Sequence, residues 1–354
     1  MSMHDAVFRP DPATAGPARA HTVRIAGGES TFSCEAGDVL LRAALRQGLG
    51  VPHECNVGGC GTCRYELLEG EVDTVWAQAP GLSERDRQKG RRLACQSRPR
   101  TDCTIKLRLM PQYQPVVTPA RTMATLLERR PVTHDIVEFR FRLEEDAGFV
   151  PGQYALLELP GVDGARAYSM SNTANAGREW HFIVRRVPGG QGSGALFDRI
   201  RAGDRIGLDG PYGQAYLRQD SPRNVVCIAG GSGLAPMLSV ARGMHDAGML
   251  AGRSLDFFFG GRGPADIAGR QEVESLGNQG DVRFHPAISH PQPGDPPWEG
   301  YVGWIHEHMA EVLGERLAAS EFYFAGPAPM AEAVLAMLVQ AGVPASQMHY
   351  DRYF

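Results

Sequence analysis

Four cysteines have the spacing of an iron–sulfur site. Cys55, Cys60 and Cys63 lie in the loop ECNVGGCGTC, and Cys95 stands well apart. This C-x4-C-x2-C spacing with a distant fourth cysteine is typical of a plant-type [2Fe–2S] cluster, whose potential is strongly reducing. Glycines in the loop let backbone N–H groups approach the sulfurs, whereas a zinc site, the alternative, usually shows two short cysteine pairs. The sequence therefore predicts a one-electron carrier held by these four metal ligands.

A second group of residues could bind a flavin dinucleotide. Arg166 could pair with a pyrophosphate, Tyr168 offers a flat aromatic surface, and Ser169 offers a polar group for the N5 edge of the ring. The glycine-rich stretch 189–194 precedes a helical pattern over 195–200, so its backbone N–H groups could face a phosphate. An ordinary strand with a surface arginine is the alternative for the first segment. The predicted flavin-binding residues are Arg166, Tyr168, Ser169, Gly190, Gly192 and Ser193.

Three glycine clusters follow apolar strands in the last third of the chain. The strand 224–229 leads into GGSGLAP at 230–236, and similar clusters stand at 259–262 and 325–330. Ligands of doubly wound sheets bind outside the carboxyl ends of the strands, where all three clusters would lie. A proline suits the first turn of the helix that follows, although a plain strand-to-helix turn is the alternative reading of the first cluster. The predicted nucleotide-binding residues are Gly230, Gly231, Gly233, Pro236, Gly326 and Pro327.

The end of the second of these strands leaves the choice of nucleotide open. An acidic residue there would bind the adenosine ribose, but this chain has Arg262 instead. Since an arginine could accept a 2′-phosphate, these residues alone do not choose between NADH and NADPH.

The elements that position these sites form three blocks in a chain of 354 residues. After a tail at 1–20, short strands and a helix pattern at 21–110 surround the cysteine loop. A proline-rich linker at 111–121 leads to alternating strands at 122–221, which predict an antiparallel β-barrel. Apolar strands alternate with helices at 222–354, which predicts a doubly wound parallel sheet. The fold class is therefore multi-domain, α+β followed by α/β.

Composition excludes several functions. The net charge of −4 gives no argument for nucleic acid or an anionic membrane surface, and no apolar run approaches a membrane span. No secretory signal is visible, and seven cysteines, three of them crowded, suit metal binding in a reducing compartment. We therefore expect a cytoplasmic protein that is a monomer when not bound to its electron-transfer partner. Cys34, Cys103 and Cys227 are expected to be small buried apolar residues.

Taken together, the motifs resemble the ferredoxin-first reductase components of bacterial multicomponent oxygenases, most of all those of toluene monooxygenase systems. The resemblance covers nearly all of 21–354 and includes ECNVGGCGTC, RRLACQ, PGQY, RAYSMSN, LDGPYG, IAGGSGLAPM, AGPAPM and HYDRYF. It implies a β-grasp ferredoxin domain, FAD on the barrel, and NADH as the usual donor. It also implies that Phe354 covers the flavin ring and moves for hydride transfer, beside Ser169. One departure is Ala325, where members usually have a cysteine that lies near the nicotinamide.

The predicted function is electron transfer from NADH through FAD and the cluster to an oxygenase component or a Rieske-type ferredoxin, because only a flavin here can convert a hydride into single electrons. A cytochrome P450 is an alternative acceptor. Two other hypotheses are a non-catalytic iron–sulfur redox sensor and a self-contained NAD(P)H oxidase. The sequence shows no oxygen-activating site, and His306 and His308, two residues apart, are expected on the surface.

Overall fold

The structure is a computed structural model that describes residues 20–351, so most of the predicted tail and Phe354 lie outside the described residues. The chain divides into two compact units. One contains the chain up to Pro115 together with Pro160–Gly164, and the other contains Val116–Leu159 and the chain from Ala165 onward. The predicted domain boundaries stay predictions.

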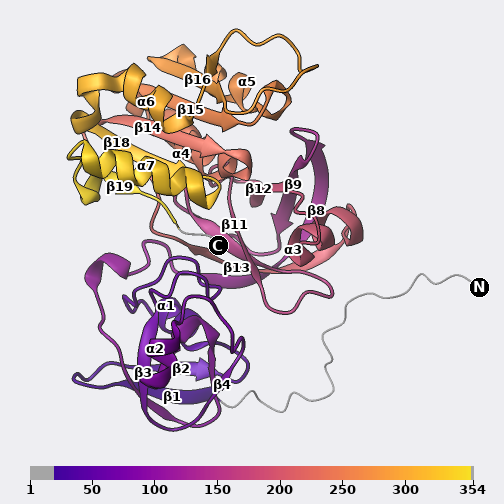
Figure 1. Ribbon diagram of the computed structural model, residues 1–354. Coiled ribbons are helices and arrows are strands. Elements are labelled where there is room, and N and C mark those ends of the chain that lie inside the picture. Colours follow the sequence, from indigo (N-terminus) through magenta and orange to yellow (C-terminus); the bar gives the residue numbers. More distant parts are fainter. Residues whose placement is uncertain (1–19, 352–354) are drawn as a thin grey trace, which may run out of the picture. The chain divides into compact units, whose positions relative to one another are not determined.

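The first unit is a mixed sheet with a helix packed against it (Figure 1). Its strand order is β2-β1-β7-β3-β5, in which β1 pairs antiparallel with β2 and parallel with β7. Alternate side chains of β1 are buried, and five residues of α1 cover that apolar face. The elements are β1 (Ala20–Ile25), β2 (Thr31–Glu35), α1 (Leu40–Arg46), β3 (Arg64–Glu69), β4 (Val72–Thr74), α2 (Glu84–Gln88), β5 (Arg91–Leu93), β6 (Ser97–Pro99) and β7 (Cys103–Lys106).

The second unit begins with the predicted antiparallel barrel. Six strands follow the order β11-β10-β13-β8-β9-β12, and a bridge between Met170 and Phe182 links the two edge strands, so the barrel is nearly closed. Aromatic side chains such as Phe139, Phe141 and Trp180 fill its interior. The elements are β8 (Ala120–Pro131), β9 (Ile136–Leu143), β10 (Tyr154–Glu158), β11 (Arg166–Ser169), β12 (Glu179–Arg185), α3 (Gln191–Gly194) and β13 (Arg205–Tyr212).

The barrel is followed by a parallel sheet buried on both faces, which confirms the predicted doubly wound fold. Its order is β17-β16-β15-β14-β18-β19. Helices α4 and α5 supply the core on one face, and α6 and α7 supply the core on the other. The elements are β14 (Asn224–Gly230), α4 (Leu234–Asp246), β15 (Leu255–Gly261), α5 (Arg270–Glu274), β16 (Val282–Ile288), β17 (Tyr301–Val302), α6 (Ile305–Leu313), β18 (Ser320–Ala325), α7 (Ala328–Gln340) and β19 (Met348–His349).

Three details refine the sequence expectations. The helical pattern at 195–200 is one π-helical turn, Ala195–Arg199, that continues α3. Cys34, Cys103 and Cys227 are buried, as expected. Within the described residues, every helix is too short or too polar to cross a membrane.

Candidate functional site

The cysteine loop is shaped by backbone N–H groups that point at sulfur. The Sγ of Cys55 accepts the N–H of Gly59 at 3.2 Å and that of Cys60 at 3.3 Å, and the Sγ of Cys60 accepts the N–H of Thr62 at 3.5 Å. Cys55 is buried, whereas Cys60 is partly exposed. The loop therefore presents its sulfurs on one side of a backbone already folded to donate hydrogen bonds to thiolates.

The four predicted ligands form two pairs. A hydrogen bond between Cys55 and Cys60 raises the pKa of Cys55 and lowers that of Cys60 to about 5. A second hydrogen bond, with Cys63, and burial raise the pKa of Cys95. No three His, Cys, Asp or Glu side chains within residues 20–351 converge as they would around one metal ion. The two pairs, Cys55 with Cys60 and Cys63 with Cys95, include all four predicted ligands.

Two residues fix the shape of this loop. Gly61 has a φ of +78°, and a Cβ there would lie 2.2 Å from the carbonyl oxygen of Gly81, so only glycine fits. Asn56 also has a positive φ, 56°, and is only 1% exposed. Neither its Oδ1 nor its Nδ2 has a hydrogen-bond partner among the described residues. A buried amide without a partner is costly, and its N–H group is the kind of donor that a cluster sulfur accepts.

The flavin motif and the glycine-rich loop come together in the barrel. Strand β11 carries Arg166, Tyr168 and Ser169 and pairs antiparallel with β10. A Cβ on Gly192 would lie 2.9 Å from both the Cγ of Arg166 and the hydroxyl of Tyr168. Burial raises the pKa of Tyr168 to about 12. The two predicted segments, far apart in sequence, thus form one surface with an arginine, an aromatic ring and a close backbone.

Ser193 holds the glycine-rich loop in place. Its hydroxyl accepts the N–H of Val187 at 3.1 Å and lies 3.5 Å from the carbonyl oxygen of Gly190. Ser193 is 6% exposed. Its hydroxyl therefore closes the turn that places Gly190 and Gly192 beside β11.

A cavity of about 500 Å³ opens at the carboxyl ends of the parallel strands. That volume is in the range of small-molecule sites, and the position is where doubly wound sheets bind ligands. Predicted residues Gly230, Gly231 and Pro327 line it. Side chains from the barrel and from other parts of the parallel-sheet domain also line it, among them Asp135, Arg185, Arg262, Asp266, Ser289, His290, Trp304, His306 and Met330.

The remaining predicted residues do not line the cavity but pack against the residues and elements that form it. A Cβ on Gly233 would lie 2.0 Å from the carbonyl oxygen of Ala325, so glycine is needed for the loop to pack on β18. A Cβ on Gly326 would lie 2.4 Å from the Cε of Met330, which does line the cavity. Pro236 is buried in the first turn of α4, where its missing N–H is tolerated.

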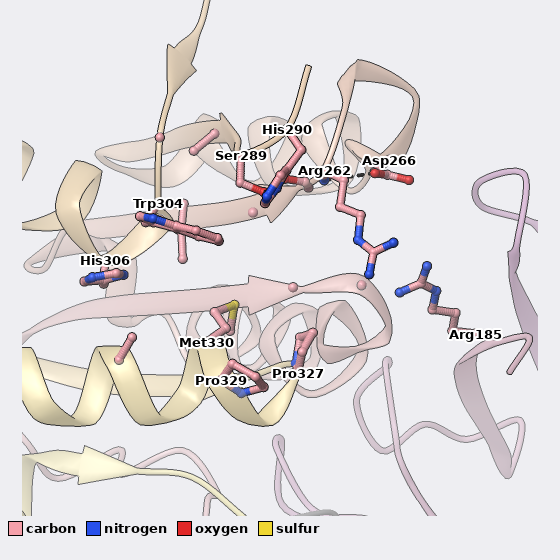
Figure 2. Close-up of a pocket in the computed structure, with 18 of the residues that line it drawn as sticks. Arg185, Arg262, Asp266, Ser289, His290, Trp304, His306, Pro327, Pro329 and Met330 are labelled. Carbon is pink, nitrogen blue, oxygen red and sulfur yellow. Dashed lines mark hydrogen bonds between the residues drawn. The ribbon is translucent and has the colours of Figure 1, made fainter. Parts of the chain in front are cut away.

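Two arginines face the same end of the cavity. Figure 2 shows the guanidinium groups of Arg185, from the barrel, and Arg262, from the end of β15, pointing toward each other. The Nε of Arg185 donates to Asp135 at 2.6 Å. Burial acts to raise the pKa of Asp135, but the hydrogen bond and positive charge of Arg185 keep that pKa below its ordinary value. Two cations that converge beside a glycine turn make a site for an anion.

Three family models match the chain in order. They describe a 2Fe-2S iron–sulfur cluster binding domain over residues 23–100, an oxidoreductase FAD-binding domain over 123–216, and an oxidoreductase NAD-binding domain over 227–336.

Relatives match over almost the whole chain. The ferredoxin–NAD(P)(+) reductase of Metapseudomonas resinovorans is 39% identical, over 92% of this chain and 98% of its own length. The ferredoxin–NAD(+) reductase component of the alkene monooxygenase system of Xanthobacter autotrophicus is 40% identical, over 94% and 100%. The chain belongs to the reductase components of multicomponent oxygenases. This reductase carries a [2Fe–2S] cluster and FAD, through which electrons pass from NAD(P)H to an oxygenase or ferredoxin.

Solved structures agree with this assignment. The reductase is similar to a ferredoxin reductase in carbazole 1,9a-dioxygenase, with a TM-score of 0.87, 34% identity, and coverage of 96% of this chain and 100% of that one. It is also similar to an Amycolatopsis cytochrome P450 reductase, with a TM-score of 0.79, 31% identity, and coverage of 94% and 98%. The same three-part plan thus occurs in both structures.

The histidines of α6 differ from the expectation that they lie on the surface. His306 lines the cavity of the reductase, and the ring of His308 stacks on Tyr301 at 4.3 Å between centroids. Burial lowers the pKa of His308. The helical spacing correctly placed the two residues on different faces, but it could not reveal that both faces meet other elements.

Several cavity residues of the reductase carry no sequence signal. Arg185, Asp135, Trp304 and His306 belong to no recognisable motif, and only their convergence in the fold reveals them. Arg262 had a signal, since it occupies the strand end where an acid is usual. Phe354, the predicted cover of the flavin ring, lies outside the described residues.

Proposed function

We propose that this reductase takes NADH as its donor and supplies electrons to the ferredoxin or terminal component of an aromatic oxygenase. The observation that carries the proposal is the cavity at the strand ends, because both the parallel sheet and the barrel line it. Gly230 ends β14 and Gly231 directly follows it, whereas Ile136 and Arg185 come from the barrel. A nucleotide bound there would therefore lie next to the domain that carries the flavin.

The charges in the cavity favour NADH over NADPH. The Oδ2 of Asp266 accepts the backbone N–H groups of Arg262, at 2.9 Å, and of Gly263, at 3.0 Å. A carboxylate thus lies at the strand end where the adenosine ribose binds in sheets of this kind. It would repel a 2′-phosphate. Arg185 and Arg262 are then left for the pyrophosphate, which both nucleotides share.

The four cysteines are proposed as the cluster ligands and the barrel motif as the flavin site. Bound there, the flavin supplies the conversion between a two-electron donor and a one-electron acceptor. Arg166 would neutralise the flavin pyrophosphate, and Tyr168 would stack against the ring. Ser169, next to it on β11, would offer its hydroxyl to the ring edge.

The acceptor is proposed to be a ferredoxin or an oxygenase component, as the names of the sequence relatives state for those proteins. A cytochrome P450 is a second candidate, supported by the similarity to a P450 reductase. A redox sensor without turnover would have no use for the strand-end cavity. The cytoplasm is the proposed location, since the seven cysteines form no disulfide within the described residues and cluster assembly needs reduced thiols.

An anaerobic titration with NADH tests the proposal. We expect flavin absorbance to bleach and the cluster to give the electron paramagnetic resonance signal of its reduced form. NADPH should reduce the protein much more slowly. Bleaching of the flavin with a cluster that stays oxidised would rule out the internal relay, and faster reduction by NADPH would overturn the choice of donor.

The division of labour is tested by Cys60→Ser. We expect this variant to keep flavin reduction by NADH and to lose electron delivery to a protein acceptor, because only the cluster ligand set is changed. Equal loss of both activities would contradict the division. A Rieske-type ferredoxin and a P450, offered in turn to the unaltered protein, distinguish the two candidate acceptors.

A further inference from the structure

One face of α4 is joined to the segment that directly follows the flavin motif. Ser239, Arg242 and Asp246 are spaced so that they share that face, and we refer to them as the α4 clasp. Each is bonded to one of three successive residues, 171–173, that follow β11. The Oγ of Ser239 donates to the carbonyl oxygen of Asn172 at 2.7 Å. This helix also begins at the glycine loop of the cavity, so one rigid element connects the two proposed sites.

The other two bonds of the α4 clasp are short as well. A terminal nitrogen of Arg242 donates to the carbonyl oxygen of Ser171 at 2.6 Å. The hydroxyl of Thr173 donates to the carboxylate of Asp246 at 2.7 Å. Three side chains at helical spacing thus bind three consecutive residues, which fixes both the distance and the register between α4 and the end of β11.

Ser239 holds two strands of the barrel at once. Besides its bond to Asn172, its oxygen accepts the N–H of Gly152 at 3.1 Å. Gly152 stands two residues before β10, the strand that pairs with β11. Ser239 is completely buried, so both bonds are made in a water-free place where polar groups depend on their partners. A single hydroxyl therefore ties the helix to both strands beside the proposed flavin site.

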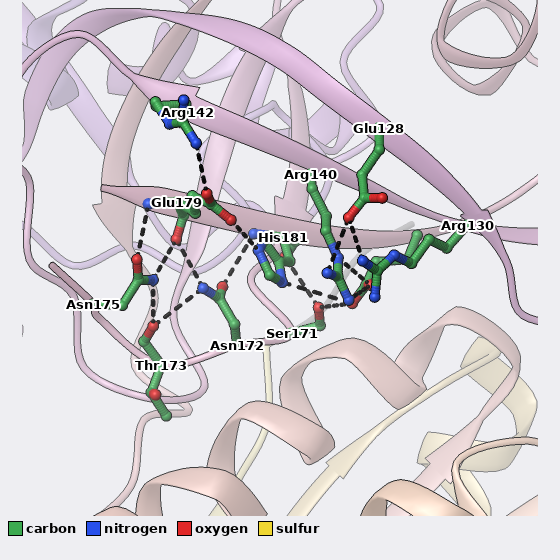
Figure 3. A network of polar contacts seen from close by, with 11 residues as sticks. Glu128, Arg130, Arg140, Arg142, Ser171, Asn172, Thr173, Asn175, Glu179 and His181 are labelled. Atoms are coloured by element: carbon green, nitrogen blue, oxygen red, sulfur yellow. Dashed lines mark hydrogen bonds and ion pairs between the residues drawn. The ribbon is translucent and has the colours of Figure 1, made fainter. Parts of the chain in front are cut away.

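The segment 171–173 is held equally firmly from its other side (Figure 3). The Oγ of Ser171 donates to the Oε1 of Glu138 on β9 at 3.1 Å. Asn172 accepts the N–H of His181 at 3.0 Å and donates to the carbonyl oxygen of Glu179 at 2.7 Å, both on β12. The segment is thus fixed to the barrel wall on one side and to α4 on the other, and cannot shift alone.

Close packing removes the remaining freedom. A Cβ on Gly243 of α4 would lie 2.5 Å from the Cγ of Pro151, which precedes Gly152 in the loop before β10. The helix backbone at Gly243 therefore packs directly against the ring of Pro151. Interiors packed in this way transmit displacements with little loss.

We propose that the α4 clasp is a set of positioning residues, with Arg242 at its centre, that sets the distance between the bound nicotinamide and the flavin. The inference rests on the proposed function, because it requires the flavin on β11 and the nucleotide at the start of α4. Arg242 stands between Ser239 and Asp246 and provides the cationic donor of the three. None of the three lines the cavity, so the α4 clasp acts on the geometry of the reaction and leaves nucleotide binding to other residues.

The test compares Arg242→Met with Arg242→Lys in the complete, cofactor-loaded protein. Stopped-flow absorbance gives the rate of flavin reduction at saturating NADH, and the dependence on NADH gives its Kd. We expect Arg242→Met to slow reduction about 10- to 100-fold, because small misplacements of reacting groups cost factors of this size. The Kd should change less than about threefold. Arg242→Lys, which keeps a donor for the carbonyl of Ser171, should recover most of the rate.

A spectroscopic readout separates positioning from general damage. Stacking of nicotinamide on flavin gives a long-wavelength charge-transfer absorbance when NAD+ is added to the reduced protein. We expect Arg242→Met to weaken this band and Arg242→Lys to restore it. Arg253→Met is the matched control, since Arg253 also donates to a backbone carbonyl, that of Gln219 at 3.2 Å, but does not touch the segment 171–173. It should leave both band and rate unchanged.

Thr173→Val gives a second route if Arg242→Met fails to fold. It removes only the bond to Asp246 at a partly exposed position, and we expect reduction to slow about threefold with flavin content unchanged. The inference is overturned if both variants retain the wild-type rate and charge-transfer band, or if they change Kd and leave the limiting rate unaltered. Failure of the unaltered protein to be reduced by NADH would instead overturn the proposed function.

Discussion

The cysteine loop and the strand-end cavity reach their chemistry by opposite means. In the cysteine loop, the contacts to sulfur come from backbone N–H groups within a few residues of Cys55 and Cys60. In the cavity, the lining side chains come from separate strands and helices, including Arg185 of the barrel. The loop depends on backbone shape, whereas the cavity depends on how whole elements approach each other.

This difference determines which substitutions each site tolerates. Apart from its three cysteines, a change of side chain within the loop matters mainly when it alters the backbone, because backbone N–H groups make the hydrogen bonds to sulfur. A change of side chain in the cavity removes a contact and leaves the backbone as it was. A substitution that distorts the loop should therefore abolish cluster binding, whereas a substitution in the cavity should only lower nucleotide affinity.

Gly61→Ala should break the loop completely. The new Cβ would lie 2.2 Å from the carbonyl oxygen of Gly81, so the loop must open, and we expect loss of the cluster measured as iron and sulfide per protein. Gly90→Ala is the control, because Gly90 has a similar φ of +69° but nothing within 4 Å of the new Cβ. Both variants bear the cost of a positive φ, roughly 1–2 kcal/mol. A cluster retained in Gly61→Ala would show that the clash can be relieved.

Arg262→Gln should weaken nucleotide binding in the cavity by the loss of one charged contact. A hydrogen bond to a charged group is worth about 1.5–3 kcal/mol, so we expect the Kd for NADH to rise about tenfold or more. Titration of the oxidised protein with NAD+ provides an independent value. Arg270→Gln is the control, since Arg270 pairs with Glu274 on α5 outside the cavity. An unchanged Kd in Arg262→Gln would remove this arginine from the proposed pyrophosphate site.

Asn56→Gly tests the one buried side chain of the loop that has no partner. Glycine accepts the φ of 56° without strain, so the substitution removes the amide alone. If the amide donates to a cluster sulfur, its loss costs about 1 kcal/mol in the reduced state, or about 40 mV for a one-electron couple. We expect the midpoint potential to fall by that amount in a spectroelectrochemical titration, with iron content unchanged. An unaltered potential would mean that the amide faces elsewhere.

The smallest effect concerns the acid stability of the unit that contains the loop. Hydrogen bonds from Ser83 and Arg91 lower the pKa of Asp86 to about 2. Because the folded pKa lies below the ordinary value, the carboxylate stabilises the fold above about pH 4, and this contribution is lost as the pH falls toward 2. We expect the temperature at which cluster absorbance disappears to fall between pH 5 and pH 3. Asp86→Asn should show a lower temperature at pH 5 and a weaker dependence on pH.

The sequence was sufficient for the fold, and it singled out Gly230, Gly231 and Pro327, which line the cavity. The period-2 strands at 136–143 and the apolar strands at 224–229 distinguished the barrel from the parallel sheet, because burial on one face or both leaves different patterns. The glycines at 230–233 were recognisable because backbone constraints restrict the choice of residue.

Several residues of the candidate site could not be predicted from sequence patterns. Arg185 lies in an ordinary strand, and only the approach of the barrel to the sheet brings it beside Gly231. His308 was expected on the surface because helical spacing says nothing about Tyr301, the ring that covers it. Asn56 differs again, since its missing partner is visible only once burial and hydrogen bonds are known. Contacts between distant segments depend on tertiary structure, which local sequence does not encode.

The α4 clasp has a consequence for the construction of chimeric reductases. A junction near residue 222, between the two C-terminal family domains, would separate Ser239, Arg242 and Asp246 from their partners at 171–173. A junction at Pro115, where the chain passes from one compact unit to the other, keeps all three bonds within one parent. The barrel and the parallel sheet should therefore be inherited as one cassette, and engineers seeking new acceptor specificity should exchange the ferredoxin part alone.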